Sequence, residues 1–266
     1  MVGGGVFVRR VEGAFHMNNL GARVYGLAAI NMGILGLLWG EWAAGGISIP
    51  KALPGHVMVA YVASALLVAG GVLINWKRAW GAALLTALFA LDILLLCVPG
   101  VVKHIAVFGY WDASAEPLAL AAAGLIAFAA SANIDPRLSE RLQYAGRAAF
   151  ALCLFSFGWA HFAYLDRTVS MVPGWLPPSQ MFWAWFTALA AIAAGLAFIS
   201  GVQALLAARL LTLMYIIFGV FVHTPILMAG HTTHFNWTEN AVNYALVGAA
   251  WIVADALAAH KRGSTS

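Results

Sequence analysis

Two stretches of this chain decide its fold: RAWGAALLTALFALDILLLCVP at residues 78–99 and ALLAARLLTLMYIIFGVFVHTP at residues 204–225. Laid on each other without gaps, they share a Leu-Leu-Thr sequence and end on the same residue type, Pro99 and Pro225. Each stretch is long and apolar enough to cross the ~30 Å hydrocarbon core of a bilayer as a helix. The pair therefore predicts a membrane protein built from a repeated unit.

The alignment continues on both sides of these stretches. At the same offset Trp111 falls on Trp237. Upstream, with small gaps, the loop at residues 49–54 (IPKALP) falls on residues 172–177 (VPGWLP). Alanine and leucine coincide easily in so apolar a chain, whereas proline and tryptophan in a fixed order do not. We interpret the pattern as an internal duplication.

Composition bounds the class of protein. Of the 266 residues, 63% are hydrophobic and only 9% are charged, whereas soluble domains are about a quarter charged. The apolar runs are continuous, without the alternation of polar and apolar residues that an outer-membrane barrel needs. We expect an all-α integral membrane protein whose partner is the lipid bilayer. Its basic residues border the apolar runs and do not cluster with aromatic residues, which argues against nucleic-acid binding.

The apolar runs predict eight transmembrane helices, arranged as two tandem four-helix bundles. The expected helices are residues 20–44, 56–75, 78–98, 116–132, 143–165, 180–199, 204–228 and 238–259. The expected division is an N-terminal tail at 1–19, a first repeat at 20–132, a cytoplasmic linker at 133–142, a second repeat at 143–259 and a C-terminal tail at 260–266.

Basic residues set the expected orientation, because short loops rich in Lys and Arg stay in the cytoplasm. One side holds Arg9, Arg10, Arg23, Lys77, Arg78, Arg137, Arg141, Arg147, Arg209, Lys261 and Arg262, out of 14 Lys and Arg in all. The other side has Lys51, Lys103 and Arg167. Both termini are therefore expected in the cytoplasm, in a bacterial-type cytoplasmic (inner) membrane. Residues 1–16 lack the pattern of a secretory leader, and whether they belong to the native chain stays open.

Residues 144–257 resemble the DoxX family of small four-helix membrane proteins. The resemblance rests on His161-Phe162, Val172-Pro173-Gly174-Trp175-Leu176-Pro177, Thr187, Gly195, Arg209, His223-Thr224-Pro225 and Trp237 with Asn240-Ala241, in that order. Residues 20–130 keep the spacing with fewer of these residues, so the chain looks like a fused pair of DoxX-like units. One branch of the family resembles the quinone-reducing membrane subunit of thiosulfate oxidation, which makes a quinone-linked redox role the implied function. Many members carry a Thr-Gly-x-x-Glu pattern where this chain reads TALAA at residues 187–191, so that carboxylate has no counterpart here.

Histidines gather at the expected extracytoplasmic ends of the helices. His231 and His234 have a His-x-x-His spacing, and His223 precedes them on the previous helix. Imidazole suits copper, zinc or haem iron, so His223, His231 and His234, with His161, are candidate metal ligands. The alternatives are that some of these histidines handle protons or contact a ligand, or that His and Trp simply favour the membrane–water interface.

Carboxylates supply the other candidates. Asp92 is expected well within hydrocarbon depth, where a charge costs about 2.5–3.5 kcal/mol, so it must face the bundle interior. Glu41 and His161 occupy equivalent positions in the two repeats, and we expect that they approach each other if the repeats pack about an axis normal to the membrane. In each case the alternative is a purely structural hydrogen bond.

The last helix begins with an unusually polar segment. Glu239 and Asn243 are four residues apart and share a face, and Asn240 with Tyr244 forms a neighbouring stripe. These residues, with Trp237 to stack on a ring, are the candidate cofactor-binding set, unless they only join helices. A quinone is one candidate cofactor, and haem, copper or zinc rank below it.

The leading hypothesis is a DoxX-like redox subunit with a polar, His-containing pocket near the extracytoplasmic face, in which His161, His223, Glu239, Glu41 and Asp92 handle protons. The alternatives are a small-solute transporter or binding protein with Asp92 as its central polar site, and an assembly subunit for a membrane redox complex. The sequence leaves open whether the protein is an enzyme, which redox partner it meets and whether it forms oligomers.

Overall fold

The computed structural model describes residues 19–43 and 47–263, and this part of the chain is helical without a β-strand. The first half forms α1 (Leu20–Trp39), α2 (His56–Trp76), α3 (Arg78–Asp92), the π-helical segment η1 (Ile93–Cys97), α4 (Val98–Lys103) and α5 (Phe108–Ser131). The second half forms α6 (Pro136–Ala163), α7 (Leu165–Met171), α8 (Gln180–Ser200), α9 (Ala204–Phe218), the π-helical segment η2 (Gly219–His223), α10 (Thr224–Met228) and α11 (His234–Gly263).

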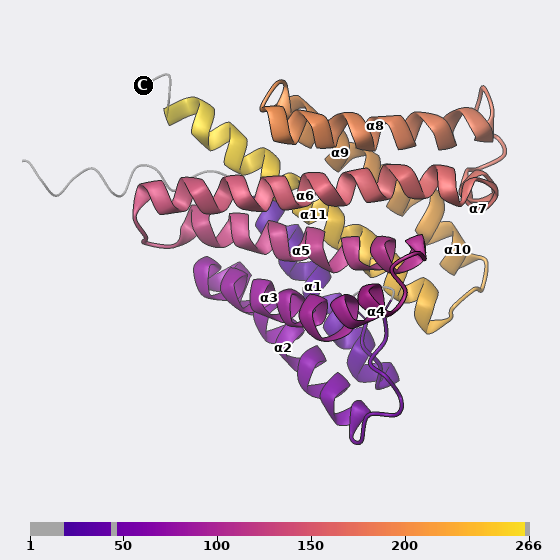
Figure 1. The fold of residues 1–266 in the computed structure, drawn as a ribbon, viewed down its shortest axis with the longest axis horizontal. Coiled ribbons are helices and arrows are strands. Elements are labelled where there is room, and N and C mark those ends of the chain that lie inside the picture. The colour runs from indigo at the N-terminus through magenta and orange to yellow at the C-terminus, as the bar shows by residue number, and fades with distance from the viewer. Residues whose placement is uncertain (1–18, 44–46, 264–266) are drawn as a thin grey trace, which may run out of the picture.

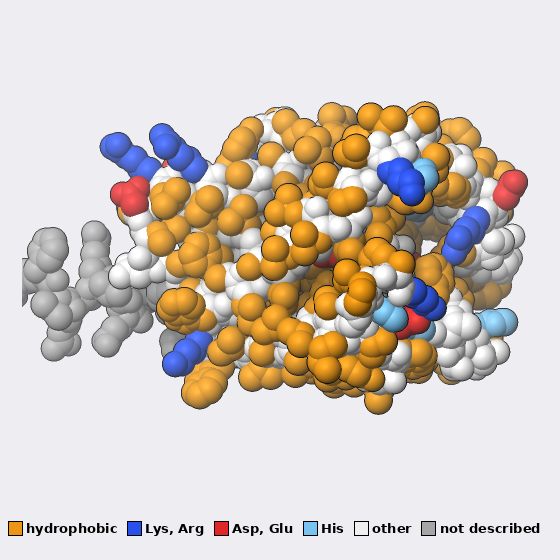
Figure 2. Space-filling model, turned by 60° about the horizontal axis from the view of Figure 1, so that its bottom comes forward, with side chains coloured by type: hydrophobic (Ala, Val, Ile, Leu, Met, Phe, Trp, Pro, Cys, Tyr) orange, Lys and Arg blue, Asp and Glu red, His pale blue; other side chains and the backbone are white. Residues whose placement is uncertain are grey.

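The helices have the length and composition of membrane spans. Within the described residues 7 helices qualify by themselves, and the number is 8 if α6 and α7, bent by 93° at their junction, count as one span. Apolar side chains cover the middle of the molecule, and charged side chains gather toward its two ends (Figure 2). The prediction of an all-helical, multi-pass membrane protein is confirmed.

The two stretches quoted first fold alike. Helix α3 and helix α9 each have 15 residues, each runs directly into a five-residue π-helical segment, and a proline stands two residues after the end of that segment. Proline has no N–H to donate and its ring collides with the carbonyl oxygen four residues earlier, so a regular α-helix cannot continue through it. The wider π-helical turn before Pro99 and Pro225 accommodates the ring. This correspondence supports the duplication hypothesis.

The two halves are interlocked. Helix α1 packs against α2 and against α11 from the other half, while α6 packs against α8 and against α5. Helices α5 and α11 also touch each other in the middle of the molecule (Figure 1). The expectation of two tandem four-helix bundles therefore needs revision, because each half fills one side of its bundle with the last helix of the other half.

Small residues permit this exchange. A Cβ atom at Gly21 of α1 would lie 2.6 Å from the backbone nitrogen of Ile252 in α11, and one at Gly248 would collide with the backbone of Tyr25. The two backbones therefore approach closely, as small residues allow in membrane helices. The Tyr25 side chain is fully buried and its hydroxyl donates a hydrogen bond to the Leu120 carbonyl oxygen of α5 at 2.8 Å.

Several helix boundaries differ from those expected. Helix α5 begins at Phe108, eight residues before the predicted start, and α11 begins at His234, four residues early. Helix α6 begins at Pro136, so most of the predicted linker is helical; the side chain of Asp135 accepts the backbone N–H groups of Arg137 and Leu138 and caps this helix. Helix α1 ends at Trp39, before the predicted end, and α11 continues into the predicted C-terminal tail. The predicted N-terminal tail lies outside the described residues except for Asn19.

Candidate functional site

Three carboxylates lie in the interior where α5 meets α11. Asp112 and Glu116 are four residues apart on α5 and share a face, and Glu239 comes from the first turns of α11. Glu116 interacts electrostatically with both of the other two, and its Oε2 atom is buried without a hydrogen-bond partner among the described residues. We call these three residues the carboxylate cluster. Buried carboxylates must be neutralised by a proton or a cation, because an isolated charge in a low-dielectric interior is very costly.

Two groups hold the rim of the cluster. The Oδ1 atom of Asp112 accepts a hydrogen bond from the Ser156 hydroxyl of α6 at 3.1 Å. Arg167 of α7 attracts Glu239, and its guanidinium lies 5.9 Å from the ring centroid of Phe235. The cluster is therefore anchored on α6 and meets a cation on the short helix that follows the bend.

Asp92 lies at the point where α3 becomes η1. Its side chain is buried, and its Oδ1 atom accepts a hydrogen bond of 3.0 Å from Nε1 of Trp42, which is itself buried. The thiol of Cys97 interacts electrostatically with both Asp92 and Glu116. The sequence prediction that Asp92 faces the bundle interior agrees with this placement.

Tyr215 of α9 completes the interior group from the second half. It is 5% exposed, and its hydroxyl is buried without a hydrogen-bond partner among the described residues. Glu116 lies within its electrostatic range. The Asn243 side-chain amide of α11 donates to the Tyr215 carbonyl oxygen at 3.0 Å, at the entry to η2. A buried hydroxyl without a partner is suited to a hydrogen bond with a bound ligand.

Two of the four predicted cofactor-binding residues of α11, Asn240 and Tyr244, converge on one threonine. Thr224 at the start of α10 receives a hydrogen bond of 3.4 Å from the Asn240 amide and lies 3.3 Å from the Tyr244 hydroxyl. Trp237 is half-buried and packs against the core. Asn240, Asn243 and Tyr244 thus join α11 to α9, η2 and α10, whether or not they also hold a ligand.

His161 lies near the C-terminal end of α6. Its Nδ1 atom is 2.8 Å from the Phe157 carbonyl oxygen, which can only accept, so Nδ1 carries the proton of the neutral ring and Nε2 is left as an acceptor. The ring centroid lies 6.4 Å from that of Phe218. His223, at the end of η2, is half-buried.

The expected approach of Glu41 to His161 is not formed. Glu41 instead lies 3.2 Å from Nδ1 of His234 and 3.7 Å from Nζ of Lys51. The reason is the interlocked packing, since α1 lies along α11 and brings the residues after Trp39 to the first turn of α11. Trp39 also packs against the His234 ring, with centroids 5.6 Å apart.

The three histidines that were predicted to bind a metal are not gathered into one group. His231 is exposed in the loop between α10 and α11, while His234 is held by Glu41. Within the described ranges no group of three or more His, Cys, Asp or Glu side chains is positioned to hold a metal ion.

Four residues of this interior group, Asp112, Glu116, Tyr215 and Thr224, were not chosen as candidate site residues from the sequence. Glu116 was expected at the start of a helix at residues 116–132, with Asp112 just before it, and Tyr215 and Thr224 were expected within the helix at residues 204–228. The available signal was the spacing of Asp112 and Glu116, which places two carboxylates on one helical face directly before a long apolar run.

The fold and its interior polar group define a multi-pass α-helical membrane protein. Residues 142–224 match the family model of DoxX, from α6 through η2 to the first residue of α10. This region is similar to the DoxX family of membrane proteins, in agreement with the sequence resemblance of residues 144–257. No curated protein and no solved structure matches it significantly.

Proposed function

We propose that this protein is a proton-handling redox subunit of a bacterial-type cytoplasmic membrane, and that its carboxylate cluster exchanges protons with a quinone near the extracytoplasmic face. The observation that carries the proposal is the meeting of Asp112, Glu116 and Glu239 in the interior. Ionisable residues inside membrane spans are costly and are typical of proton relays and substrate pathways.

The surroundings of the cluster support the choice of a quinone. Reduction of a quinone takes up electrons and protons in equal number, so a quinone site needs a nearby proton source. In the DoxX branch named above the electrons come from a reduced sulfur compound. Glu239 and Glu116 would deliver protons, with His161 and His223 as further carriers. Trp237, Asn240 and Tyr244 would contact the ring and its carbonyl oxygens.

The duplication and the orientation are part of the same proposal. The two repeats supply the same helical scaffold, and both termini lie in the cytoplasm according to the distribution of Lys and Arg. The ends of α5 and α11 that carry the cluster then face the extracytoplasmic side, since each runs from there toward the basic side of the molecule.

Infrared difference spectroscopy of the full chain in nanodiscs tests this proposal. We expect that adding a short-chain ubiquinone quenches tryptophan fluorescence and changes a carbonyl band of protonated carboxyl groups. Glu116→Gln should remove that change while quinone binding persists, because the amide keeps the shape but carries no acidic proton.

A matched control is Asp166→Asn, which removes a carboxylate from the exposed surface of α7 on the same side of the molecule. It should leave both signals as in the unaltered protein. Absence of quinone binding, or an unchanged carboxyl band in Glu116→Gln, would contradict the proposal.

A transporter for a small cation or solute is the second candidate. It is favoured by one observation, that carboxylates from both halves meet in the interior, as expected for a path between two repeats. Asp92 would then be its deepest polar site. Uptake into vesicles that is lost in Asp92→Asn, without any quinone binding, would decide for this candidate.

A further inference from the structure

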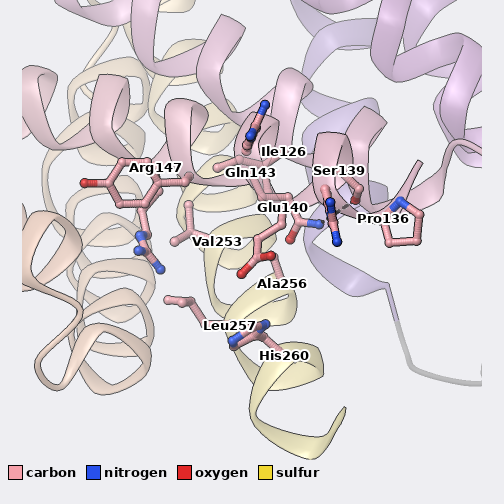
Figure 3. Close-up of a pocket in the computed structure, with 13 residues that line it drawn as sticks. Ile126, Pro136, Ser139, Glu140, Gln143, Arg147, Val253, Ala256, Leu257 and His260 are labelled. Carbon is pink, nitrogen blue, oxygen red and sulfur yellow. Dashed lines mark hydrogen bonds between the residues drawn. The ribbon is translucent and has the colours of Figure 1, made fainter. Parts of the chain in front are cut away.

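A cavity of about 860 Å³ lies at the basic end of the molecule, between the first turns of α6 and the last turns of α11. Three arginines of α6 line it, Arg137, Arg141 and Arg147, together with His260 of α11. Glu140 is the carboxylate among its lining residues. Figure 3 shows Arg147 and His260 on facing walls of this hollow.

The opposite part of the lining is apolar. Ile126 of α5 and Val253 and Leu257 of α11 face the same space as the arginines. A second cavity of about 280 Å³ shares Ile126 and Ala256 with the first. The site therefore combines a cationic rim with an apolar wall, next to the level at which a membrane helix passes from hydrocarbon to water.

Arg147 has a donor without an acceptor in the part of the chain that the structure describes. Its Nε atom is buried and has no hydrogen-bond partner among the described residues. Its guanidinium lies 5.4 Å from the ring centroid of Tyr144, which holds the planar group in place. Buried donors without an acceptor are rare, so an acceptor from outside the described residues is expected beside Arg147.

We propose that this cavity binds the phosphate headgroup of an anionic phospholipid from the adjacent leaflet, with an acyl chain along Ile126, Val253 and Leu257. Guanidinium groups bind phosphate oxygens in a bidentate manner, and three arginines against one glutamate leave the rim positive. Free phosphate fits the arginines equally well but leaves the apolar wall in contact with water. A basic pocket between helices at the membrane surface is the setting in which lipid headgroups are recognised.

Binding to the full chain in neutral detergent distinguishes these sources. We would titrate phosphatidylglycerol, phosphatidylcholine and inorganic phosphate separately, and follow bound lipid by native mass spectrometry and the unfolding temperature. Phosphatidylglycerol should bind saturably and raise the unfolding temperature, with little effect from the other two. Equal binding of phosphatidylcholine, or an equal effect of inorganic phosphate, would overturn the proposal.

Two variants locate the site. Arg147→Gln should weaken phosphatidylglycerol binding by about ten-fold, the loss expected for one charge-assisted hydrogen bond. Arg209→Gln removes the same charge from the exposed start of α9, at the same end of the molecule but outside the cavity, and should bind as tightly as the unaltered protein. Equal affinities in the two variants would refute the site. Should Arg147→Gln fail to fold, Arg141→Gln provides the same comparison.

Discussion

The segment α3–η1–α4 and the segment α9–η2–α10 have the same order of helical elements, but the side chains in the middle of the two segments differ. Where α3 meets η1 the first carries Asp92, and at the equivalent point the second carries Phe218. One residue later than each π-helical segment, Val98 corresponds to Thr224. The geometry follows from the shared proline and apolar length, whereas the chemistry follows from the residues that differ.

Each central residue is matched to its own surroundings. Asp92 receives the N–H of Trp42, whereas Phe218 packs with the rings of Tyr215 and His161, at centroid distances of 6.3 and 6.4 Å. A duplicated scaffold can thus hold a buried carboxyl group on one side and an aromatic contact on the other. The comparison also shows why equivalent positions in the two repeats need not have equivalent roles.

The largest effect is expected from placing the first half's residue in the second half. Phe218→Asp introduces a carboxylate in hydrocarbon without a Trp42 equivalent to bind it, which should lower the free energy of unfolding by about 3 kcal/mol or more. Thermal unfolding in detergent measures this loss. Phe218→Leu is the control and should cost clearly less, because it removes ring contacts without adding a charge. Similar stabilities of the two variants would mean that the two centres are chemically interchangeable.

An intermediate loss of stability is expected from changing Asp92 in the first half. Asp92→Leu leaves Nε1 of Trp42 buried without an acceptor, so the free energy of unfolding should fall by about 1–3 kcal/mol. Asp92→Asn retains an acceptor oxygen and should lose less. The difference between the two variants, measured by the same unfolding assay, gives the value of the Trp42 hydrogen bond. If Asp92→Leu proved as stable as Asp92→Asn, that bond would have no structural role.

The smallest effect concerns Thr224. Thr224→Val gives the second half the residue that stands at position 98 in the first, and removes the hydroxyl that Asn240 and Tyr244 share. Polar contacts between membrane helices are worth about 0.6 kcal/mol on average, so we expect a loss of that order. Val98→Thr is the reciprocal change at a site exposed to lipid. A loss of several kcal/mol in Thr224→Val would show that this contact organises η2.

Sequence patterns predicted the helices and not the way in which they pack. Hydropathy identifies helices such as Leu20–Trp39 and His56–Trp76, because it measures how favourably each side chain transfers from water to an apolar environment. It failed at the start of α5, where polar residues such as Asp112 lowered the local hydropathy, so that the helix was predicted to begin only at Glu116. Within an interlocked molecule that face of α5 is covered by α11 and not by lipid, and no local property of the segment reveals this.

The candidate site residues also divide into those whose environment could be predicted from the sequence and those whose environment depends on how the helices pack. Asp92 could be assigned to the interior because a lone charge deep in a span has no other place. The partner of Glu41 could not be predicted, because it depends on α1 lying along α11. Arg137, Arg141 and Arg147 were interpreted as markers of topology, and their gathering around one cavity depends on where the end of α11 comes to lie.

The interlocked packing has a consequence for how the chain is made. Helix α1 leaves the ribosome early and α11 late, yet each is a main packing partner of the other. During synthesis α1 therefore remains in the membrane with the Gly21 face uncovered until α11 has been inserted. The contacts that close the molecule have a large separation in sequence, so they form last, and a nascent chain that stops after the first repeat would lack the helix that completes it.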